Sequence, residues 1–256
     1  MKIPERNRRW RQLVELSRRI GTAAESYAIL GEGNTSTRSG EDTFWVKASG
    51  TSLSTAKKDS FTECLRPILE RLWESKSRSD TEVDEKLLAA RVDPKAGKPS
   101  TEVLFHSYLL SLPGIEWVAH THPIAVNGIL CSPRASDFAK FRMFPDEIVC
   151  GGEQSVLVPY TDPGVPLAKA IRTGVENFEK EQGRLPRMIL LQNHGLIAIG
   201  PSAGAVEATT KMAEKSAKIF LGAASLGGPV FMPEAQVRRI SGRPDELYRQ
   251  KVLKLE

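Results

Sequence analysis

Segments with a helical pattern alternate with short apolar segments along most of this chain. Residues 165–182 and 203–224 are predicted to be helices, and the second of these is long. Between them, residues 188–192 and 196–199 are apolar runs that predict a strand or a hairpin around His194. Helices that alternate with strands pack in layers on a sheet, so the pattern predicts a three-layer α/β domain.

The other segments fit the same arrangement, and no internal repeat or domain boundary interrupts it. We therefore expect one domain over residues 1–256, with a core of about residues 10–226 and a helical tail over residues 227–256. Further helices are predicted over residues 5–27, 60–74, 85–91, 99–112 and 244–254, strands over 43–48, 116–126, 148–150 and 154–159, a turn over 30–38, and a mobile polar loop over 75–84.

The composition is that of an ordinary soluble globular protein. Hydrophobic residues make up 40% of the 256 residues and charged residues 26%. No apolar run approaches the length that spans a bilayer, and the N-terminal segment has no apolar stretch typical of a signal peptide. The three cysteines are far apart and lack metal-ligand spacing. We therefore expect reduced thiols, a cytoplasmic location and no membrane partner.

The net charge of +5 raises the question of nucleic-acid binding. Much of the excess lies in residues 2–19, where Trp10, Leu13 and Leu16 form one stripe of a helix and the arginines occupy the rest. No zinc finger, aromatic-rich RNA motif or basic repeat accompanies this helix, so we expect no nucleic-acid partner. Attraction of a small anionic substrate is the better interpretation of the charge.

All four histidines lie where they could serve a metal site. His120 and His122 are two residues apart on a predicted strand, so their side chains point to the same face. His194 follows an apolar run, and His106 comes one helical turn after Glu102. Three imidazoles with one open position are the usual ligands of a catalytic zinc site. Taken singly, a histidine near an apolar run is more often a buried core residue than a metal ligand.

Small polar residues gather in three turns that could bind an anion. Ser100 and Thr101 begin a predicted helix, where hydroxyls, backbone N–H groups and the helix dipole favour a phosphate, although simple helix capping explains Ser100 as well. Asn34 and the Ser49-Gly50 pair lie in two further turns, where the alternative is ordinary turn chemistry.

The five motifs together resemble a known family more closely than any one of them does alone. In chain order they are residues 33–36 (GNTS), 47–50 (KASG), 99–102 (PSTE), 120–123 (HTHP) and 193–195 (NHG). This order resembles the class II aldolase/adducin family, whose members include fuculose-1-phosphate and rhamnulose-1-phosphate aldolases. The resemblance covers about residues 10–226 and implies a central, mainly antiparallel sheet between helices.

The resemblance also implies a role for each matching residue. His120, His122 and His194 match the family's metal ligands, and Glu102 matches the acidic residue that approaches the metal and acts as the base. The positions that hold the substrate's phosphate are matched by Asn34, Ser49, Gly50, Ser100 and Thr101. The implied cofactor is a divalent ion, zinc first, with manganese, cobalt or iron as alternatives. The implied assembly is a homotetramer.

The implied reaction is aldol cleavage of a small phosphorylated ketose or keto-acid through a metal-stabilised enediolate. One feature departs from the aldolases, because residues 130–151 contain no tyrosine to serve as the proton donor. Asp137, Lys140 or Arg142 could replace it. The alternatives are therefore a sugar-acid phosphate decarboxylase or a dehydratase of the same family, or a non-catalytic, adducin-like interaction protein.

Overall fold

The structure is a computed structural model that describes residues 1–72 and 79–252. The chain divides into two compact units. The first unit contains residues 1–118 and 161–172, and the second contains residues 119–160 and 173–256. Strand β4 (Trp117–Thr121) and helix α8 (Val165–Gln182) contribute residues to both units. The expectation of a single domain over residues 1–256 stays a prediction.

The first unit is built on a short antiparallel sheet. Its strands are β1 (Asn34–Arg38), β2 (Thr43–Lys47) and β3 (Phe61–Leu65), which follow the order β3-β2-β1-β4. Both neighbouring pairs around β2 are antiparallel, and Trp45 lies opposite Thr37 on one side and Glu63 on the other. Because the side chains of a strand alternate between two faces, Asn34 and Ser36, which are two residues apart on β1, lie on the same face of the sheet.

Helix α1 (Ile3–Ile20) packs on β1 through the apolar stripe that the sequence predicts. Leu13, Leu16 and Ile20 are fully buried, and the Ser17 hydroxyl lies 2.6 Å from that of Thr35. The remaining helices of this unit are the 3₁₀ helix η1 (Lys58–Ser60), α2 (Arg66–Glu70), α3 (Asp80–Ala89) and α4 (Val103–Leu109).

The second unit contains the strand order β4-β7-β6-β5. Strands β6 (Met188–Leu191) and β7 (Gly195–Gly200) form an antiparallel hairpin, whereas β5 (Val156–Val158) runs parallel to β6. Every residue of β6 and β7 is buried, which explains why both strands appear in the sequence as continuous apolar runs. The helices are α5 (Ile124–Leu130), α6 (Ala135–Lys140), α7 (Pro145–Gly151), α9 (Ala203–Ala224), α10 (Glu234–Ser241) and α11 (Pro244–Val252).

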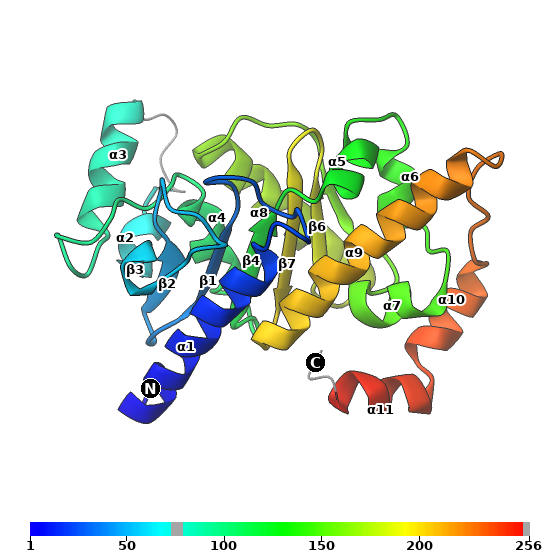
Figure 1. Cartoon of the computed structure of the whole chain (residues 1–256), viewed down its shortest axis with the longest axis horizontal. Coiled ribbons are helices and arrows are strands. Elements are labelled where there is room, and N and C mark those ends of the chain that lie inside the picture. Colours follow the sequence, from blue (N-terminus) through cyan, green and yellow to red (C-terminus); the bar gives the residue numbers. More distant parts are fainter. Residues whose placement is uncertain (73–78, 253–256) are drawn as a thin grey trace. The chain divides into compact units, whose positions relative to one another are not determined.

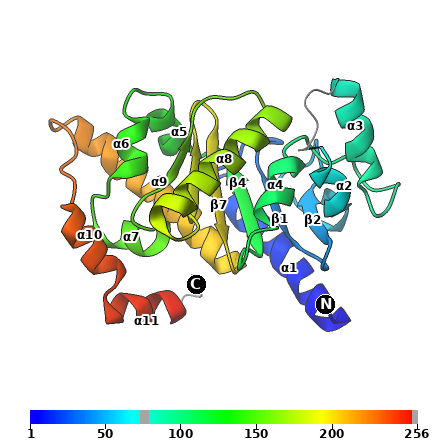
Figure 2. The same ribbon diagram turned by 180° about the vertical axis from the view of Figure 1, so that it is seen from behind.

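The long helix α9 organises the core of the second unit. It contacts β7, α5 and α7, and Figure 1 shows it crossing the hairpin. Val126, Leu130 and Leu196 pack in the cluster under it, and Phe138 meets Phe220 edge to face. Seen from behind, α10 and α11 lie beside α7 (Figure 2).

Several predicted elements need correction. Residues 61–65 form strand β3 rather than the first part of a helix, because they pair in register with β2 and the helix begins only at Arg66-Pro67. Residues 148–150 belong to α7, which Pro145 begins, and do not form a strand. The first helix ends at Ile20, and Gly21 caps it at a position where a side chain would collide with residues 53–54.

Three other boundaries also differ. Strand β4 ends at Thr121, and α5 replaces the expected end of that strand. Residues 34–38 form β1 within the predicted turn. The predicted mobile loop, residues 75–84, lies partly outside the described residues, and its last residues belong to α3.

The predicted fold class is confirmed, because helices accompany a mainly antiparallel sheet in which the β5–β6 pair is parallel. Among the residues that the structure describes, no helix is long and apolar enough to cross a membrane.

Candidate metal centre

Three histidines of the second unit come together as the sequence predicts. His120 lies near the end of β4, His122 follows this strand directly, and His194 lies in the turn between β6 and β7. One ligand nitrogen from each lies within 4.8 Å of the others. His120 is fully buried, whereas His122 and His194 are half-buried. The cluster therefore combines one buried candidate ligand with two that are partly exposed.

A backbone hydrogen bond sets the tautomer of His120. Its Nδ1 lies 3.0 Å from the carbonyl oxygen of Leu196 on β7. A carbonyl only accepts, so Nδ1 carries the hydrogen and Nε2 presents a lone pair. That lone pair faces the Nε2 of His122 at 3.0 Å. Two nitrogens bound to one tetrahedral zinc at 2.0–2.1 Å lie roughly 3.3 Å apart, so this spacing fits a shared divalent ion.

The turn that carries His194 has an unusual backbone. Asn193 adopts a φ of 56°, in the left-handed region that asparagine tolerates better than most residues. The side-chain amide of Asn127 on α5 donates to the carbonyl of His194 at 3.0 Å. This contact holds the His194 backbone, and no sequence pattern indicates the role of Asn127.

Gly195 allows the hairpin to approach the other two histidines. A Cβ at this position would lie 2.6 Å from the carbonyl oxygen of Thr121, 2.7 Å from Cδ2 of His122 and 3.2 Å from Cε1 of His120. Only glycine avoids these collisions, so the motif Asn193-His194-Gly195 is explained by backbone geometry and close packing.

A buried carboxylate fixes the helix that follows His122. Glu214 on α9 is 4% exposed and accepts hydrogen bonds from the backbone N–H groups of Ala125 and Val126 at 3.2 and 3.3 Å. These N–H groups belong to the first turn of α5 and have no partner within that helix. Glu214 therefore caps α5 from another helix, a non-local contact that the sequence does not indicate.

The first unit holds Glu102 in a hydrogen-bonded setting. The amide nitrogen of Asn34 donates to Oε2 of Glu102 at 2.5 Å, and the Ser100 hydroxyl accepts from the Glu102 backbone N–H at 3.1 Å. Three of the predicted site residues of this unit are therefore in contact. His106, one helical turn after Glu102, also hydrogen-bonds to Asn34.

The other predicted phosphate-binding residues lie in two adjacent loops of the first unit. Ser49 donates its backbone N–H to Lys98, and an isolated bridge joins the preceding residue to Pro99. Gly50 has a φ of 76°, and the position of a Cβ there is open. Thr101 lies 3.9 Å from the Cβ position of Gly164.

Lys47 is buried beside these loops and is not a solvated strand-end residue. Its ammonium donates to the carbonyls of Gly31 and Thr51 at 3.1 and 2.6 Å. Burial lowers the pKa of Lys47, and the nearby Glu102 carboxylate opposes this effect. The ammonium thus ties together the two loops that precede and follow β1 and β2.

The three candidates for the missing proton donor have different surroundings. Arg142 is fully buried and donates to the carbonyls of Gly152 and Phe141, so its role is to bind the chain around α6. Asp137 pairs with Arg134 at 2.6 Å. Lys140 lines a cavity of about 490 Å³ that contains none of the predicted site residues.

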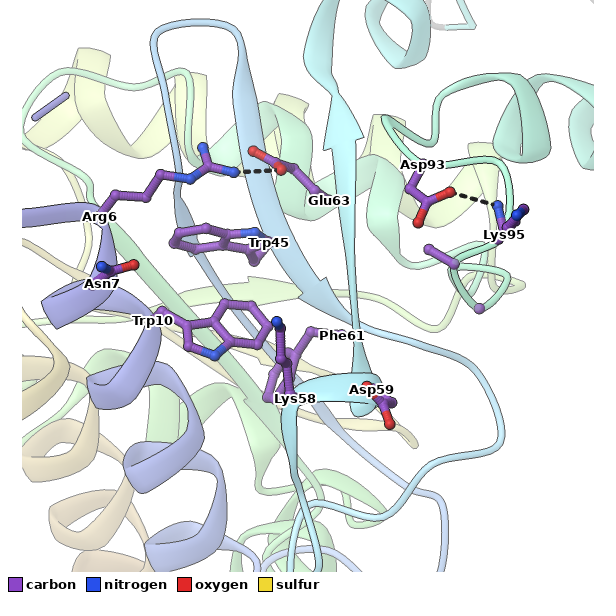
Figure 3. A pocket seen from close by; sticks show the side chains of 12 residues that line it. Arg6, Asn7, Trp10, Trp45, Lys58, Asp59, Phe61, Glu63, Asp93 and Lys95 are labelled. Carbon is purple, nitrogen blue, oxygen red and sulfur yellow. Dashed lines mark hydrogen bonds and ion pairs between the residues drawn. The ribbon is translucent and has the colours of Figure 1, made fainter. Parts of the chain in front are cut away.

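A larger cavity of about 680 Å³ lies in the first unit, between α1 and strands β2 and β3 (Figure 3). Trp10 and Trp45 meet edge to face in it, and the Arg6 guanidinium stacks over Trp45 while pairing with Glu63 at 2.6 Å. Its remaining charged residues (Lys58, Asp59, Asp93 and Lys95) balance in sign. This cavity shares no residue with the predicted site.

Comparison with known proteins places these observations in a family. The profile described as the Class II Aldolase and Adducin N-terminal domain matches residues 11–221. A curated relative, the uncharacterized oxidoreductase YuxG of Bacillus subtilis (strain 168), is 31% identical over 204 residues. These are 75% of this chain but 26% of the relative, so the chain spans about a quarter of that protein.

Solved structures agree with this match. The N-terminal class II aldolase domain of a conserved protein from Thermoplasma acidophilum is 26% identical, with a TM-score of 0.63, over 82% of this chain and 92% of that one. The L-fuculose 1-phosphate aldolase from Glaciozyma antarctica PI12 is 17% identical, with a TM-score of 0.62, over 98% and 90%. At this lower identity, the likeness shows a shared fold alone.

Proposed function

Because the chain belongs to the class II aldolase and adducin family, we propose that it is a metal-dependent lyase that cleaves a small phosphorylated ketose. The observation that carries this proposal is the cluster of His120, His122 and His194, whose ligand nitrogens lie within 4.8 Å of one another. A non-catalytic, adducin-like role gives no reason for three converging imidazoles, one of them with its tautomer set by a backbone carbonyl.

The proposed cofactor is one divalent ion, with zinc as the first choice and manganese, cobalt or iron as alternatives. When bound, such an ion supplies Lewis-acid stabilisation of negative charge on the substrate's oxygens. His120 would hold it through Nε2, because Nδ1 is committed to the carbonyl of Leu196. The half-buried His122 and His194 would complete the set and leave one side open to substrate.

Glu102 is the proposed base. A hydrogen bond donated by an amide favours the charged form of a carboxylate, and a charged carboxylate can take the proton next to a carbonyl group. The contact from Asn34 at 2.5 Å gives Glu102 such a partner. Glu102 lies in the first unit and the histidines in the second, so this assignment depends on the family match and on the contacts of Glu102 itself.

The proposed phosphate cradle consists of Asn34, Ser49, Gly50, Ser100 and Thr101. The contact between the Ser49 backbone and Lys98 supports the grouping of the last four, because it brings residues 48–51 beside residues 98–100. Exposed backbone around a glycine and small hydroxyl side chains suit an anion that must be approached closely. The resemblance further leads us to propose a homotetramer in the cytoplasm.

The first experiment is a measurement of divalent metal in the purified protein, followed by an assay of ketose 1-phosphates for triose or glycolaldehyde products. We expect about one ion per chain, and cleavage that stops on chelation and returns when metal is restored. Full turnover by metal-free protein would refute the mechanism. Bound metal without cleavage would instead favour a decarboxylase or dehydratase, and a complete lack of metal would favour the interaction protein.

Two variants separate metal binding from proton transfer. His194→Ala should lose both the ion and turnover, because it removes one of three nitrogen ligands. Glu102→Gln should keep the ion and lose turnover, because a carboxamide cannot take the proton. Glu70→Gln, which alters an exposed carboxylate on α2, is the matched control and should change neither. Normal turnover by Glu102→Gln would remove this residue from the base role.

A further inference from the structure

A chain of hydrogen bonds links β1 to α4 in the first unit and ends on Glu102. The Ser36 hydroxyl lies 2.6 Å from Nδ1 of His106, and Nε2 of His106 contacts Oδ1 of Asn34. Nδ2 of Asn34 then donates to Oε2 of Glu102 at 2.5 Å. Asn34 and Ser36 share one face of β1, and Glu102 and His106 are four residues apart at the start of α4.

The members of this chain other than Glu102 are shielded from solvent. Ser36 and His106 are fully buried, and Asn34 is 5% exposed. The ring of Phe105 stacks on the His106 imidazole, with centroids 4.7 Å apart and planes 25° apart. A substrate therefore cannot reach His106, and the hydrogen bonds through Asn34 connect His106 to Glu102.

The carboxylate at one end determines the direction of every hydrogen bond. A carboxylate only accepts, so Asn34 must turn its NH₂ group toward Glu102 and its carbonyl oxygen toward His106. That oxygen also only accepts, so Nε2 of His106 must carry a hydrogen. A neutral imidazole then has a bare Nδ1, which accepts from the Ser36 hydroxyl. All donors point toward Glu102, and hydrogen bonds aligned in this way strengthen one another.

The other tautomer of His106 would displace the side chain of Glu102, the proposed base. If His106 carried its hydrogen on Nδ1, the amide of Asn34 would have to turn over to satisfy Nε2, and its oxygen would face Oε2 of Glu102 at 2.5 Å. Two acceptor oxygens repel at that distance, so the Glu102 side chain would have to leave. The tautomer of a buried histidine thus selects, through Asn34, the position of the Glu102 carboxylate.

We propose that His106 is a positioning residue that, in its neutral Nε2–H form and supported by Ser36, holds Asn34 in the orientation that keeps Glu102 in place. This inference rests on the proposed function for the statement that Glu102 is the base. It also gives Asn34 a task besides the predicted contact with phosphate, because its carbonyl oxygen and one N–H are committed to this chain.

Nitrogen NMR of the histidine rings tests the arrangement without reference to activity. The chain has four histidines, so selective ¹⁵N labelling gives a small set of signals, and the pair that disappears in His106→Gln belongs to His106. We expect a protonated Nε2 and a bare Nδ1. A hydrogen on Nδ1, or on both nitrogens, would overturn the proposal even if the protein proves to have no lyase activity.

Kinetics on four variants tests the consequence for Glu102. His106→Leu removes the donor to Asn34 and should lower kcat by at least about tenfold, the usual loss when a supporting partner is removed. KM and metal content should stay within about twofold, because His106 touches neither substrate nor ion. His106→Gln places an amide N–H near the position of Nε2 and should restore kcat to within about threefold of the parent protein.

The last two variants are a matched pair of buried serines. Ser36→Ala removes the donor to Nδ1 and should lower kcat, whereas Ser107→Ala, on the same helix as His106 but outside the chain of hydrogen bonds, should not. Equal kcat values for His106→Leu, His106→Gln and the parent protein would refute the positioning role. An equal loss of kcat in the two serine variants would show that kcat is merely sensitive to packing around α4. This result would also refute the positioning role of His106.

Discussion

Gly195→Ala tests whether the hairpin must approach the histidine pair as closely as the structure indicates. The new methyl group would lie 2.6 Å from the carbonyl oxygen of Thr121 and 2.7 Å from Cδ2 of His122. Ordinary contact begins at 3.4 Å, so the hairpin and β4 would have to separate by about 0.7–0.8 Å. Overpacking of this kind costs about 1–3 kcal/mol of unfolding free energy.

The same displacement acts directly on a proposed metal ligand. His122 and His120 face each other through Nε2 atoms 3.0 Å apart, so a shift of the His122 ring changes the spacing that suits one ion. Misplacing a ligand or its support lowers metal affinity by roughly 10–100-fold. Gly195→Ala should therefore lose metal at a chelator concentration that the parent protein withstands.

Metal retention and thermal unfolding should be measured on the same preparations. A loss of 1–3 kcal/mol lowers Tm by about 2–4 °C per kcal/mol in a chain of this size. Gly222→Ala is the matched control, because this helical position in α9 has no atom within 4 Å of the new Cβ and alanine favours a helix. If Gly195→Ala and Gly222→Ala retain metal equally and unfold at the same temperature, the close-approach argument is wrong.

Three further predictions concern the support of the site and the thiols. Asn193→Val should cost about 1–2 kcal/mol in chemical unfolding and Asn193→Gly almost nothing, because φ is 56° at this position; equal costs would contradict the backbone argument. Glu214→Ala should cost about 1–2 kcal/mol through the two uncapped N–H groups of α5, while Lys218→Met, which removes its exposed ion-pair partner, should cost under about 1 kcal/mol. Iodoacetamide at pH 8 should label the exposed Cys131 first, because burial raises the pKa of Cys64 to about 12; mass spectrometry that finds Cys64 labelled before unfolding would refute this.

The elements that could be predicted from the sequence are those whose pattern is long enough to be unambiguous. Helices over residues 165–182 and 203–224 are found with these bounds, and the hairpin of β6 and β7 follows its two apolar runs. The prediction of a helix over residues 61–65 is wrong, because five residues are too few for the hydrophobic periodicity to distinguish a helix from a strand. Their strand conformation comes from pairing with β2. The apolar residues 148–150 suit a strand, but they face α9 from a helix that Pro145 begins.

In the candidate site, too, features set by neighbouring residues could be predicted from the sequence, whereas features set by distant residues could not. The convergence of His120 and His122 follows from the two-residue period of a strand, which is a local property. The part played by Leu196, whose carbonyl fixes the tautomer of His120, depends on pairing between distant strands. The hydrogen bond between His106 on α4 and Asn34 on β1 likewise joins residues that are far apart in the sequence. Neither the Leu196–His120 contact nor the Asn34–His106 contact can be predicted from the sequence around either histidine.

The arrangement of the three histidines argues for an ion that takes part in chemistry rather than one that holds the fold together. Structural zinc sites are usually closed by four protein ligands, whereas among the described residues this cluster offers three. His122 and His194 remain partly accessible, and the core around Val126 and Leu130 is complete without them. Two local features fix the positions of the histidines instead: the left-handed backbone conformation of Asn193 and the close packing at Gly195. Three candidate ligands whose positions are fixed by the backbone and by close packing, two of them partly exposed, suit a bound ion that accepts substrate oxygens.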